Sequence, residues 1–286
     1  MTIISASQLL KKNLQTIYDQ REAFAISSLV MEKITGKKKS EQVLNPYIEF
    51  DPRQQLLFDK YINELLQKRP LQYVLNEAWF CGMKLYVNEN VLIPRPETEE
   101  LVQWSVDSLK LQSKQHPRVL DVGTGSGCIA LGIKKNFPSA EVFAIDISES
   151  ALKVASRNAE ENNLSVQLQQ MDITGASSIY TGEIFDLVVS NPPYIPLSDK
   201  PAMEDHVVEY EPHLALFVDD DNPLKFYDAI AGFFLLHAVP GSLLFFETHW
   251  QYAPEIKKLL EKKGLTDVEI RKDLQGHERM IRAKYP

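Results

Sequence analysis

The feature that most constrains the fold is an alternation of short apolar runs and amphipathic segments, which begins near residue 117. Apolar runs of this length are typical of buried strands, whereas the longer amphipathic segments have the spacing of helices. We expect strands at 119–122, 141–146, 165–169, 184–190 and 241–248. We expect helices at 129–137, 150–162, 223–238 and 253–263, and a final pair of strands at 268–272 and 279–283. This alternation predicts an α/β fold with a mostly parallel sheet and an antiparallel C-terminal pair.

The chain before this region is expected to be helical. A first helix follows a predicted cap at Ser5 or Ser7, and a second helix ends at Gly36. A third begins after Asp51, with Pro52 in its first turn. Short amphipathic helices must pack on one another, so a small N-terminal helical bundle is predicted.

We therefore divide the chain into three parts. Residues 1–75 form the helical domain, 76–96 a β-hairpin linker, and 97–286 the α/β domain. The hairpin is predicted from β-prone residues on both sides of 81–83. Thr98 is expected to cap the helix that opens the third part.

Composition excludes several classes of protein. No apolar run among the 286 residues is long enough to predict a membrane span, and the N-terminus lacks the pattern of a secretory leader. The two cysteines, Cys81 and Cys128, and the six histidines show no metal-ligand spacing, so no metal site is predicted. This cysteine usage is typical of a reduced, cytoplasmic compartment. The net charge of -8 disfavours non-specific binding to nucleic acid.

A glycine-rich segment follows the first strand of the α/β domain. It contains Gly123, Thr124, Gly125, Ser126 and Gly127, which match G-x-G-x-G but lack the later glycine of the dinucleotide fingerprint. The second strand ends in Asp146, and an acid at this place can accept both hydroxyls of a ribose. Together these residues predict a nucleoside-bearing ligand at the carboxyl ends of the strands. The alternative is a tight turn followed by a helix cap.

The fourth strand ends in Asn191-Pro192-Pro193-Tyr194. Two prolines cannot continue a central strand, so a stiff loop is expected beside the glycine loop. The Asn191 Oδ1 atom and the Pro192 carbonyl can accept two N–H bonds from one planar nitrogen, and Tyr194 can stack on the planar group. The chain here resembles the class I methyltransferases, whose D/N/S-P-P-Y/F/W motif holds the amino group of adenine, cytosine or glutamine. The motif alone leaves these substrates open.

Other segments narrow the resemblance to the bacterial release factor glutamine methyltransferases. The most specific is Leu92-Ile93-Pro94-Arg95-Pro96-Glu97-Thr98-Glu99. Further similar segments are at 69–73, 210–216 and 272–276. This resemblance implies a Rossmann-like domain that uses S-adenosylmethionine, and N5-methylation of the glutamine in the Gly-Gly-Gln tripeptide of release factors. It also implies a monomer whose partner is a release factor, without direct contact to nucleic acid or membrane.

The resemblance assigns residues one by one. The glycine loop at 123–127 and Asp146 match the cofactor site, Asp172 and Ile173 match the adenine contacts, and Asn191 contributes to both sites. Asn191, Pro192, Pro193 and Tyr194 match the substrate clamp, with Asn191, Pro192 and Tyr194 as the catalytic set. The sequence departs from the family pattern at Ile173, where an aromatic residue is common, and at Asn76 and within 247–251, where glycine is usual.

Two other functions are compatible with parts of the sequence. N6-methylation of adenine in DNA or RNA would use the same cofactor site and Asn-Pro-Pro-Tyr loop, but it is expected to bring a basic face or a recognition domain. A non-catalytic adaptor could bind a release factor or ribosome through the helical domain. The intact glycine loop, Asp146 and the Asn191–Tyr194 segment count against an adaptor.

Overall fold

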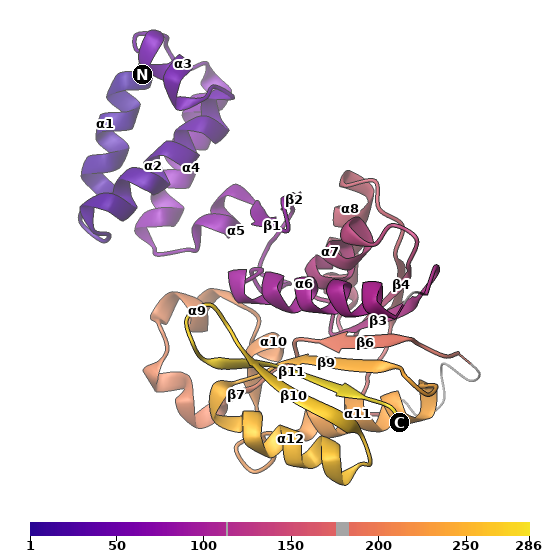
Figure 1. Ribbon diagram of the computed structural model, residues 1–286. Helices are drawn as coiled ribbons and strands as arrows, with labels where there is room; N and C mark the ends of the chain where they lie inside the picture. The colour runs from indigo at the N-terminus through magenta and orange to yellow at the C-terminus, as the bar shows by residue number, and fades with distance from the viewer. Residues whose placement is uncertain (113, 176–182) are drawn as a thin grey trace. The chain divides into compact units, whose positions relative to one another are not determined.

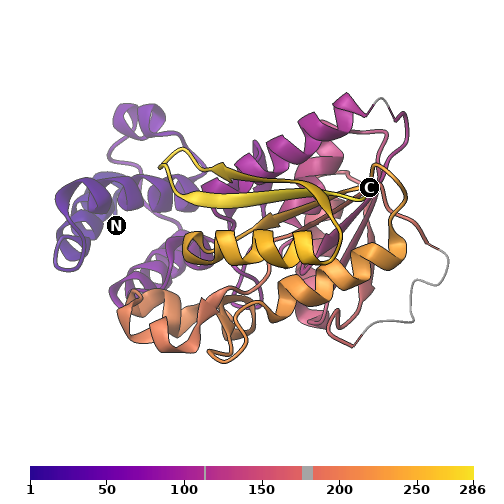
Figure 2. The ribbon, with the colours of Figure 1, turned by 60° about the horizontal axis from the view of Figure 1, so that its bottom comes forward.

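Figures 1 and 2 show a computed structural model that describes residues 1–112, 114–175 and 183–286. The chain divides into two compact units. The first consists of Met1–Glu77 together with Asp205–Tyr210, and the second of Ala78–Glu204 and Glu211–Pro286. The first unit is helical and the second is an α/β domain.

The helical unit packs around one apolar core. Its helices are α1 (Ile3–Leu14), α2 (Gln20–Thr35), α3 (Lys39–Leu44), α4 (Pro52–Leu66), α5 (Leu71–Leu75) and α9 (Asp205–Tyr210). Leu10, Val30, Phe58 and Leu65 are almost fully buried in this core. The distant α9 segment is joined to it by Tyr210, whose hydroxyl donates to the Gln67 carbonyl at 3.0 Å.

Local signals fix the ends of these helices. Asp51 accepts a hydrogen bond from the Gln54 amide at 2.8 Å and Pro52 opens α4, as predicted. The α2 helix ends at Gly36, also as predicted. The predicted cap of α1 is wrong, because Thr2 rather than Ser5 or Ser7 precedes the helix and accepts from the Ser5 amide.

The α/β unit is built on a seven-stranded sheet with the order β10-β11-β9-β6-β3-β4-β5. Its strands are β3 (Arg118–Val122), β4 (Glu141–Asp146), β5 (Gln167–Gln170), β6 (Leu187–Ser190), β9 (Leu243–Glu247), β10 (Thr266–Lys272) and β11 (Glu278–Lys284). The neighbouring pairs β9–β6, β6–β3, β3–β4 and β4–β5 are parallel. Strand β11 is antiparallel to both of its neighbours, β9 and β10. The predicted sheet is confirmed, and its strand order reverses between β3 and β6.

Helices cover both faces of this sheet, as Figure 2 shows. They are α6 (Pro96–Leu111), α7 (Cys128–Asn136), α8 (Glu149–Glu161), α11 (Lys225–His237) and α12 (Ala253–Lys262). Successive residues of a strand point to opposite faces, so Val119 packs with α6 and α7, and Leu120 packs with α11 and α12. Nearly continuous apolar strands are the consequence of burial on both faces.

Short elements complete the unit. A hairpin of β1 (Ala78–Phe80) and β2 (Met83–Leu85) precedes α6, and β7 (Ile195–Pro196) pairs with β8 (Phe217–Val218). The remaining elements are η1 (Leu197–Ala202), α10 (His213–Leu216) and η2 (Trp250–Tyr252). Within the described ranges, no helix is long and apolar enough to cross a membrane.

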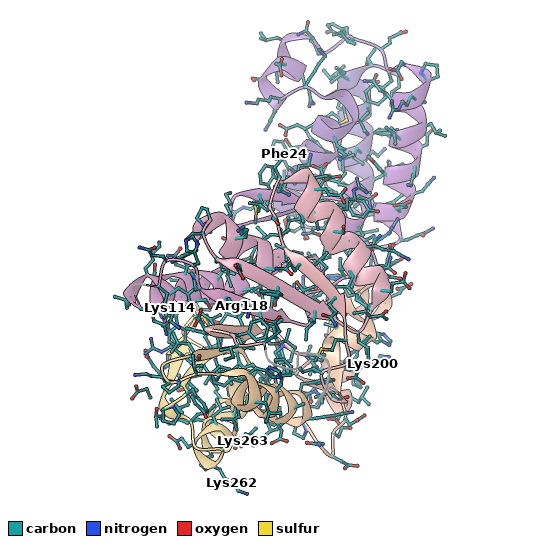
Figure 3. The ribbon with its side chains drawn as sticks, turned by 90° about the vertical axis from the view of Figure 1, so that its right-hand side faces the viewer. Phe24, Lys114, Arg118, Lys200, Lys262 and Lys263 are labelled. Atoms are coloured by element: carbon teal, nitrogen blue, oxygen red, sulfur yellow. The ribbon has the colours of Figure 1, made fainter. Side chains whose placement is uncertain are left out.

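Charged residues close the amino ends of the central strands, opposite the ends that carry the predicted site. Arg118 opens β3, and its guanidinium lies 4.9 Å from the centre of the Phe143 ring. Its backbone amide donates to Asp186 at 2.8 Å, and Lys114 forms an ion pair with the same carboxylate. Figure 3 labels Lys114 and Arg118 at this end. These charged groups are therefore used in contacts that stabilise the α/β unit.

The structure accounts for the asparagine at position 76 and corrects the role predicted for Thr98. Asn76 ends α5 in the left-handed conformation, at φ 51° and ψ 41°, which asparagine tolerates better than most residues. Asparagine therefore fits a position whose backbone conformation also suits glycine. The prediction that Thr98 caps α6 is wrong: the helix already begins at Pro96, and Thr98 lies in its first turn with a buried side chain.

Candidate active site

A cleft of about 350 Å³ opens at the carboxyl ends of β3, β4 and β6. This is where the strand order reverses, the usual place for ligands in open α/β sheets. Most of the predicted site residues line it: Gly123, Thr124, Gly125, Ser126, Asp146, Asp172, Ile173, Asn191, Pro192 and Pro193. Gly127 and Tyr194 are not among the lining residues.

The backbone amides of the glycine loop are largely used within the chain. Gly123 and Thr124 donate to the Ile145 carbonyl, each at 2.9 Å. Gly125 donates to Asp146 Oδ2 at 2.8 Å. A loop that cradles phosphates would keep such amides for the ligand. The loop therefore offers few free amides to a phosphate, which fits a nucleoside ligand better than a dinucleotide.

Gly127 contributes to the packing of two helices. Its φ of 82° is left-handed, and a Cβ placed there would lie 3.2 Å from the Ala155 Cβ. Glycine suits this position because it adopts the left-handed φ without strain and leaves room for α8 beside the start of α7.

Asp146 lies at the tip of β4, half-buried beside the glycine loop. Its Oδ1 accepts the Ser148 amide at 2.9 Å, while Oδ2 accepts from Gly125. Burial raises the pKa of Asp146, and these backbone hydrogen bonds oppose the rise. Each carboxylate oxygen retains a further lone pair for a ribose hydroxyl.

The two predicted adenine contacts differ in character. Asp172 is exposed, and its Oδ1 accepts from both the amide and the hydroxyl of Thr174, at 2.8 and 2.7 Å. The side-chain hydrogen bond from Thr174 is the main reason that the pKa of Asp172 is lowered. Ile173 is partly buried and packs against the apolar core beneath the cleft.

The Asn-Pro-Pro-Tyr loop leaves β6 at the edge of the cleft. Within the described residues, no hydrogen bond from the chain reaches the Pro192 carbonyl. Tyr194 is not among the residues that line the cleft, and its hydroxyl donates to Glu247 Oε1 at 3.3 Å. Its ring lies 6.1 Å from that of His249. The loop thus presents a free acceptor beside an anchored phenol.

Glu247 is a buried acid that our sequence analysis did not assign to the site. It ends β9 and is 1% exposed. Burial raises its pKa, while the Thr98 hydroxyl, the Arg279 charge and the Tyr194 hydroxyl oppose the rise. The sequence signal was an acid that directly follows four apolar strand residues.

A second unassigned acid, Asp121, lies within β3. It is fully buried, and its Oδ2 accepts from the Thr124 hydroxyl at 2.7 Å and the Ala130 amide at 3.1 Å. Its Oδ1 has no hydrogen-bond partner within the described residues. Burial raises the pKa of Asp121 to about 7. The acid therefore ties the glycine loop to the start of α7.

Glu211 bonds a segment that lies far away in the chain: Arg95 is 116 residues before it. It is 3% exposed, and its Oε2 accepts the Ile93 amide at 3.1 Å. Its Oε1 accepts from the Arg95 guanidinium. Both Ile93 and Arg95 line the cleft, so this carboxylate fixes one of its walls.

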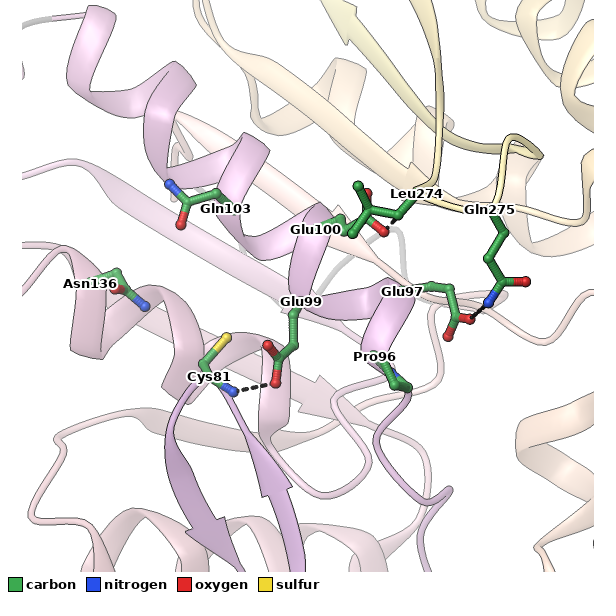
Figure 4. A pocket seen from close by; sticks show the side chains of 9 residues that line it. All are labelled: Cys81, Pro96, Glu97, Glu99, Glu100, Gln103, Asn136, Leu274 and Gln275. Atoms are coloured by element: carbon green, nitrogen blue, oxygen red, sulfur yellow. Dashed lines mark hydrogen bonds between the residues drawn. The ribbon is translucent and has the colours of Figure 1, made fainter.

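A second cavity, of about 550 Å³, lies beside the start of α6 and is shown in Figure 4. Each of the three glutamates that line it accepts a hydrogen bond from a backbone amide or a side chain. Glu99 accepts the Cys81 amide at 2.7 Å, Glu100 accepts the Leu274 amide at 3.1 Å, and Glu97 accepts from the Gln275 side chain at 2.9 Å. The acids fasten the hairpin and the β10–β11 turn to α6. Within the described residues, no three potential ligands are arranged to hold a metal ion.

Comparison with known proteins gives consistent matches over the chain. Residues 5–75 match the family described as "PrmC N-terminal domain", and residues 106–209 match "Methyltransferase small domain". The release factor glutamine methyltransferase of Flavobacterium psychrophilum is 39% identical over 273 residues, covering 95% of each chain. That of Bacteroides thetaiotaomicron is 38% identical over 274 residues, covering 96% of this chain and 97% of the relative.

A solved structure shares the fold. A methyltransferase from Pyrococcus furiosus is 21% identical and superposes with a TM-score of 0.51, covering 71% of this chain and 89% of that chain.

Proposed function

The chain belongs to the release factor glutamine methyltransferase family, and from this premise we propose how the residues of its cleft perform the reaction. It is a protein-glutamine methyltransferase that acts on the side-chain amide N5 of a glutamine in peptide chain release factors. The glutamine that we propose is the one in the Gly-Gly-Gln tripeptide. The methyl donor that we propose is S-adenosylmethionine.

The residues of the cleft fit this donor. The Asp146 carboxylate would accept the ribose hydroxyls, and Ile173 would pack on the adenine ring beside Asp172. The loop at 123–126 would face the methionine portion, which has no phosphate, and the amides of Gly123, Thr124 and Gly125 are already bonded within the chain. S-adenosylmethionine supplies an electrophilic methyl group on a sulfonium. The carboxylates near the loop suit a ligand with this positive charge.

The Asn191–Tyr194 loop would hold the glutamine. An amide nitrogen is a poor nucleophile because its lone pair is delocalised into the carbonyl. Asn191 Oδ1 and the Pro192 carbonyl would accept its two N–H bonds, which orients the nitrogen and favours lone-pair density on it. The prolines keep these acceptors in place, so little reorganisation is needed at reaction. The free Pro192 carbonyl is the observation that supports this role most directly.

After transfer, the nitrogen must lose one proton. Asn191 and Pro192 are neutral acceptors, so the surplus proton would leave to water. The Tyr194 ring would exclude water from the other side of the amide during transfer, and its hydroxyl is anchored by Glu247.

The helical unit and the hairpin would contact the rest of the release factor. We further propose that the enzyme acts as a cytoplasmic monomer and makes no direct contact with nucleic acid. A net charge of -8 supports the choice of a protein loop over a phosphate backbone.

The test is incubation of the purified protein with methyl-labelled S-adenosylmethionine and either a bacterial release factor or duplex DNA. We expect label on the release factor, at the glutamine of the Gly-Gly-Gln tripeptide, and none in DNA. Label in the DNA without label on that glutamine would replace this proposal with adenine methylation.

A further inference from the structure

A buried network of hydrogen bonds lies directly behind the Asn191 side chain. Thr98 donates from Oγ1 to Glu247 Oε2 at 2.6 Å. The Asn191 Nδ2 atom lies 3.5 Å from the same Thr98 oxygen. The other Glu247 oxygen receives the Tyr194 hydroxyl at 3.3 Å. One carboxylate therefore contacts both ends of the Asn191–Tyr194 loop, at one end through a single hydroxyl.

The register of the sheet explains this proximity. Strands β6 and β9 are parallel, and Ser190 lies opposite Phe246. Asn191, which follows β6, and Glu247, the last residue of β9, therefore emerge at the same edge of the sheet. The Tyr227 hydroxyl donates to the Glu247 carbonyl at 3.1 Å and fixes the end of β9. The network is therefore held by the ends of paired strands, which are rigid elements.

The chemistry of the groups decides which one donates and which one accepts in each hydrogen bond of the network. An ionised carboxylate only accepts hydrogen bonds, so the single hydroxyl proton of Thr98 must point at Glu247. The Thr98 oxygen then offers lone pairs to Asn191, and only the amide NH₂ of Asn191 can satisfy them. Its Oδ1 is consequently turned the other way, toward the cleft that Asn191 lines.

The positive charge of Arg279 opposes the rise in the pKa of Glu247 that burial causes. The Arg279 guanidinium itself pairs with Asp273 at 3.2 Å. The Thr248 amide donates to the Arg279 carbonyl at 2.8 Å and keeps the two strand ends together. A protonated Glu247 could donate to Thr98 and would remove the direction of the network. The partly exposed Arg279 guanidinium therefore favours the ionised form of Glu247, which can only accept hydrogen bonds.

We propose that Glu247 and Thr98 are positioning residues that fix which end of the Asn191 amide faces the substrate. The inference rests on the proposed function, because orientation matters only if Oδ1 receives an N–H bond from the glutamine. The two ends of an asparagine amide have nearly the same shape, so packing alone does not select one. A reversed Asn191 would place its NH₂ against the substrate NH₂, two donors face to face.

The first test compares two substitutions at one position by steady-state kinetics with a release factor and labelled S-adenosylmethionine. Thr98→Val removes the hydroxyl but keeps the shape, and we expect kcat to fall by roughly 10- to 100-fold. The KM for the cofactor should stay within about twofold, because Thr98 acts through Asn191. Thr98→Ser retains the hydroxyl and should keep kcat within about threefold of the unsubstituted protein.

A double-mutant cycle provides the second test. Glu247→Gln can donate to Thr98 and should lower kcat to a similar degree. The combined Thr98→Val, Glu247→Gln protein should then be no slower than the slower single variant, because both changes break the same relay. If Glu247→Gln fails to fold, the valine and serine variants decide the question alone.

Three outcomes would overturn the proposal: normal turnover of Thr98→Val, equal losses in the valine and serine variants, or multiplicative losses in the double variant. Failure of the proposed function itself would look different. In that case the unsubstituted protein would place no label on the release factor glutamine, and no cycle could be measured.

Discussion

Replacing Asp146 with asparagine tests the proposed cofactor site at its most polar point. In the structure, the two carboxylate oxygens accept the amides of Ser148 and Gly125 at 2.9 and 2.8 Å. Asparagine can keep the bond from Ser148 through its oxygen, but its NH₂ group would then face the Gly125 amide, donor against donor. The substitution also removes the charge that strengthens hydrogen bonds from ribose hydroxyls.

The expected magnitude follows from these contacts. A hydrogen bond to a charged group is worth about 1.5–3 kcal/mol, and asparagine retains one neutral acceptor of the original two. We therefore expect a loss of about 2–3 kcal/mol in cofactor binding, which corresponds to a roughly 30- to 150-fold higher Kd. Isothermal titration with S-adenosylhomocysteine, the demethylated product, measures it directly.

The matched control is Glu149→Gln, which removes a negative charge three residues away along the chain. Glu149 is exposed and pairs with Lys153 at 2.8 Å, outside the cleft. Its Kd should stay within about twofold of the unsubstituted protein, because exposed ion pairs contribute little. An Asp146→Asn protein that binds the product as tightly as this control would refute the assignment of Asp146 to the ribose.

The remaining predictions concern stability. Gly127→Ala should lower the free energy of unfolding by about 2–4 kcal/mol, because left-handed strain adds to the 3.2 Å approach to Ala155. Gly241→Ala, with φ 92° and no neighbour within 4 Å, should lose only about 1–2 kcal/mol in the same urea titration, and equal losses would refute the packing role of Gly127. The pKa of Asp121 is raised from 3.8 to about 7, so the folded state binds more protons than the unfolded state between these values. This group therefore makes stability fall as pH rises from about 4 through 7, by at most roughly 4 kcal/mol, and its effect levels off only once the pH is above the folded pKa. Asp121→Asn should remove that part of the slope when unfolding is measured across this range, and an unchanged slope would contradict the raised pKa.

Local patterns predicted much of the molecule because short-range chemistry decides them. The glycine loop, the acid at the end of β4 and the prolines after β6 each specify a turn or a strand end, and the sheet brings them to one edge. The C-cap at Gly36 and the Pro52 start of α4 are of the same kind.

Contacts between distant segments could not be predicted in this way. Thr98 and Glu247 are 149 residues apart, and they meet because α6 packs over the strand that ends in Glu247. As a result, the Thr98 hydroxyl, which a sequence reading assigns to a helix cap, is bonded to a buried acid. Tyr210 likewise reaches the Gln67 carbonyl only through the folded chain.

The same limit applies to Tyr194 and Gly127. Both belong to motifs that predict ligand contact, but a motif does not reveal which of its members face the ligand. Tyr194 is held by Glu247 and lies beside His249, and Gly127 is required by the approach of α8. The structure adds their contacts within the chain, which the motifs do not specify.

The most direct test of the central claim is mass spectrometry of a release factor after a single-turnover reaction with the unsubstituted enzyme and with Asn191→Ala. The unsubstituted enzyme should add one methyl group to the glutamine of the Gly-Gly-Gln peptide. The Asn191→Ala enzyme should add none, although it binds S-adenosylhomocysteine with a Kd within about threefold, because the clamp acts on the substrate nitrogen. Normal methylation of that glutamine by Asn191→Ala would contradict the account.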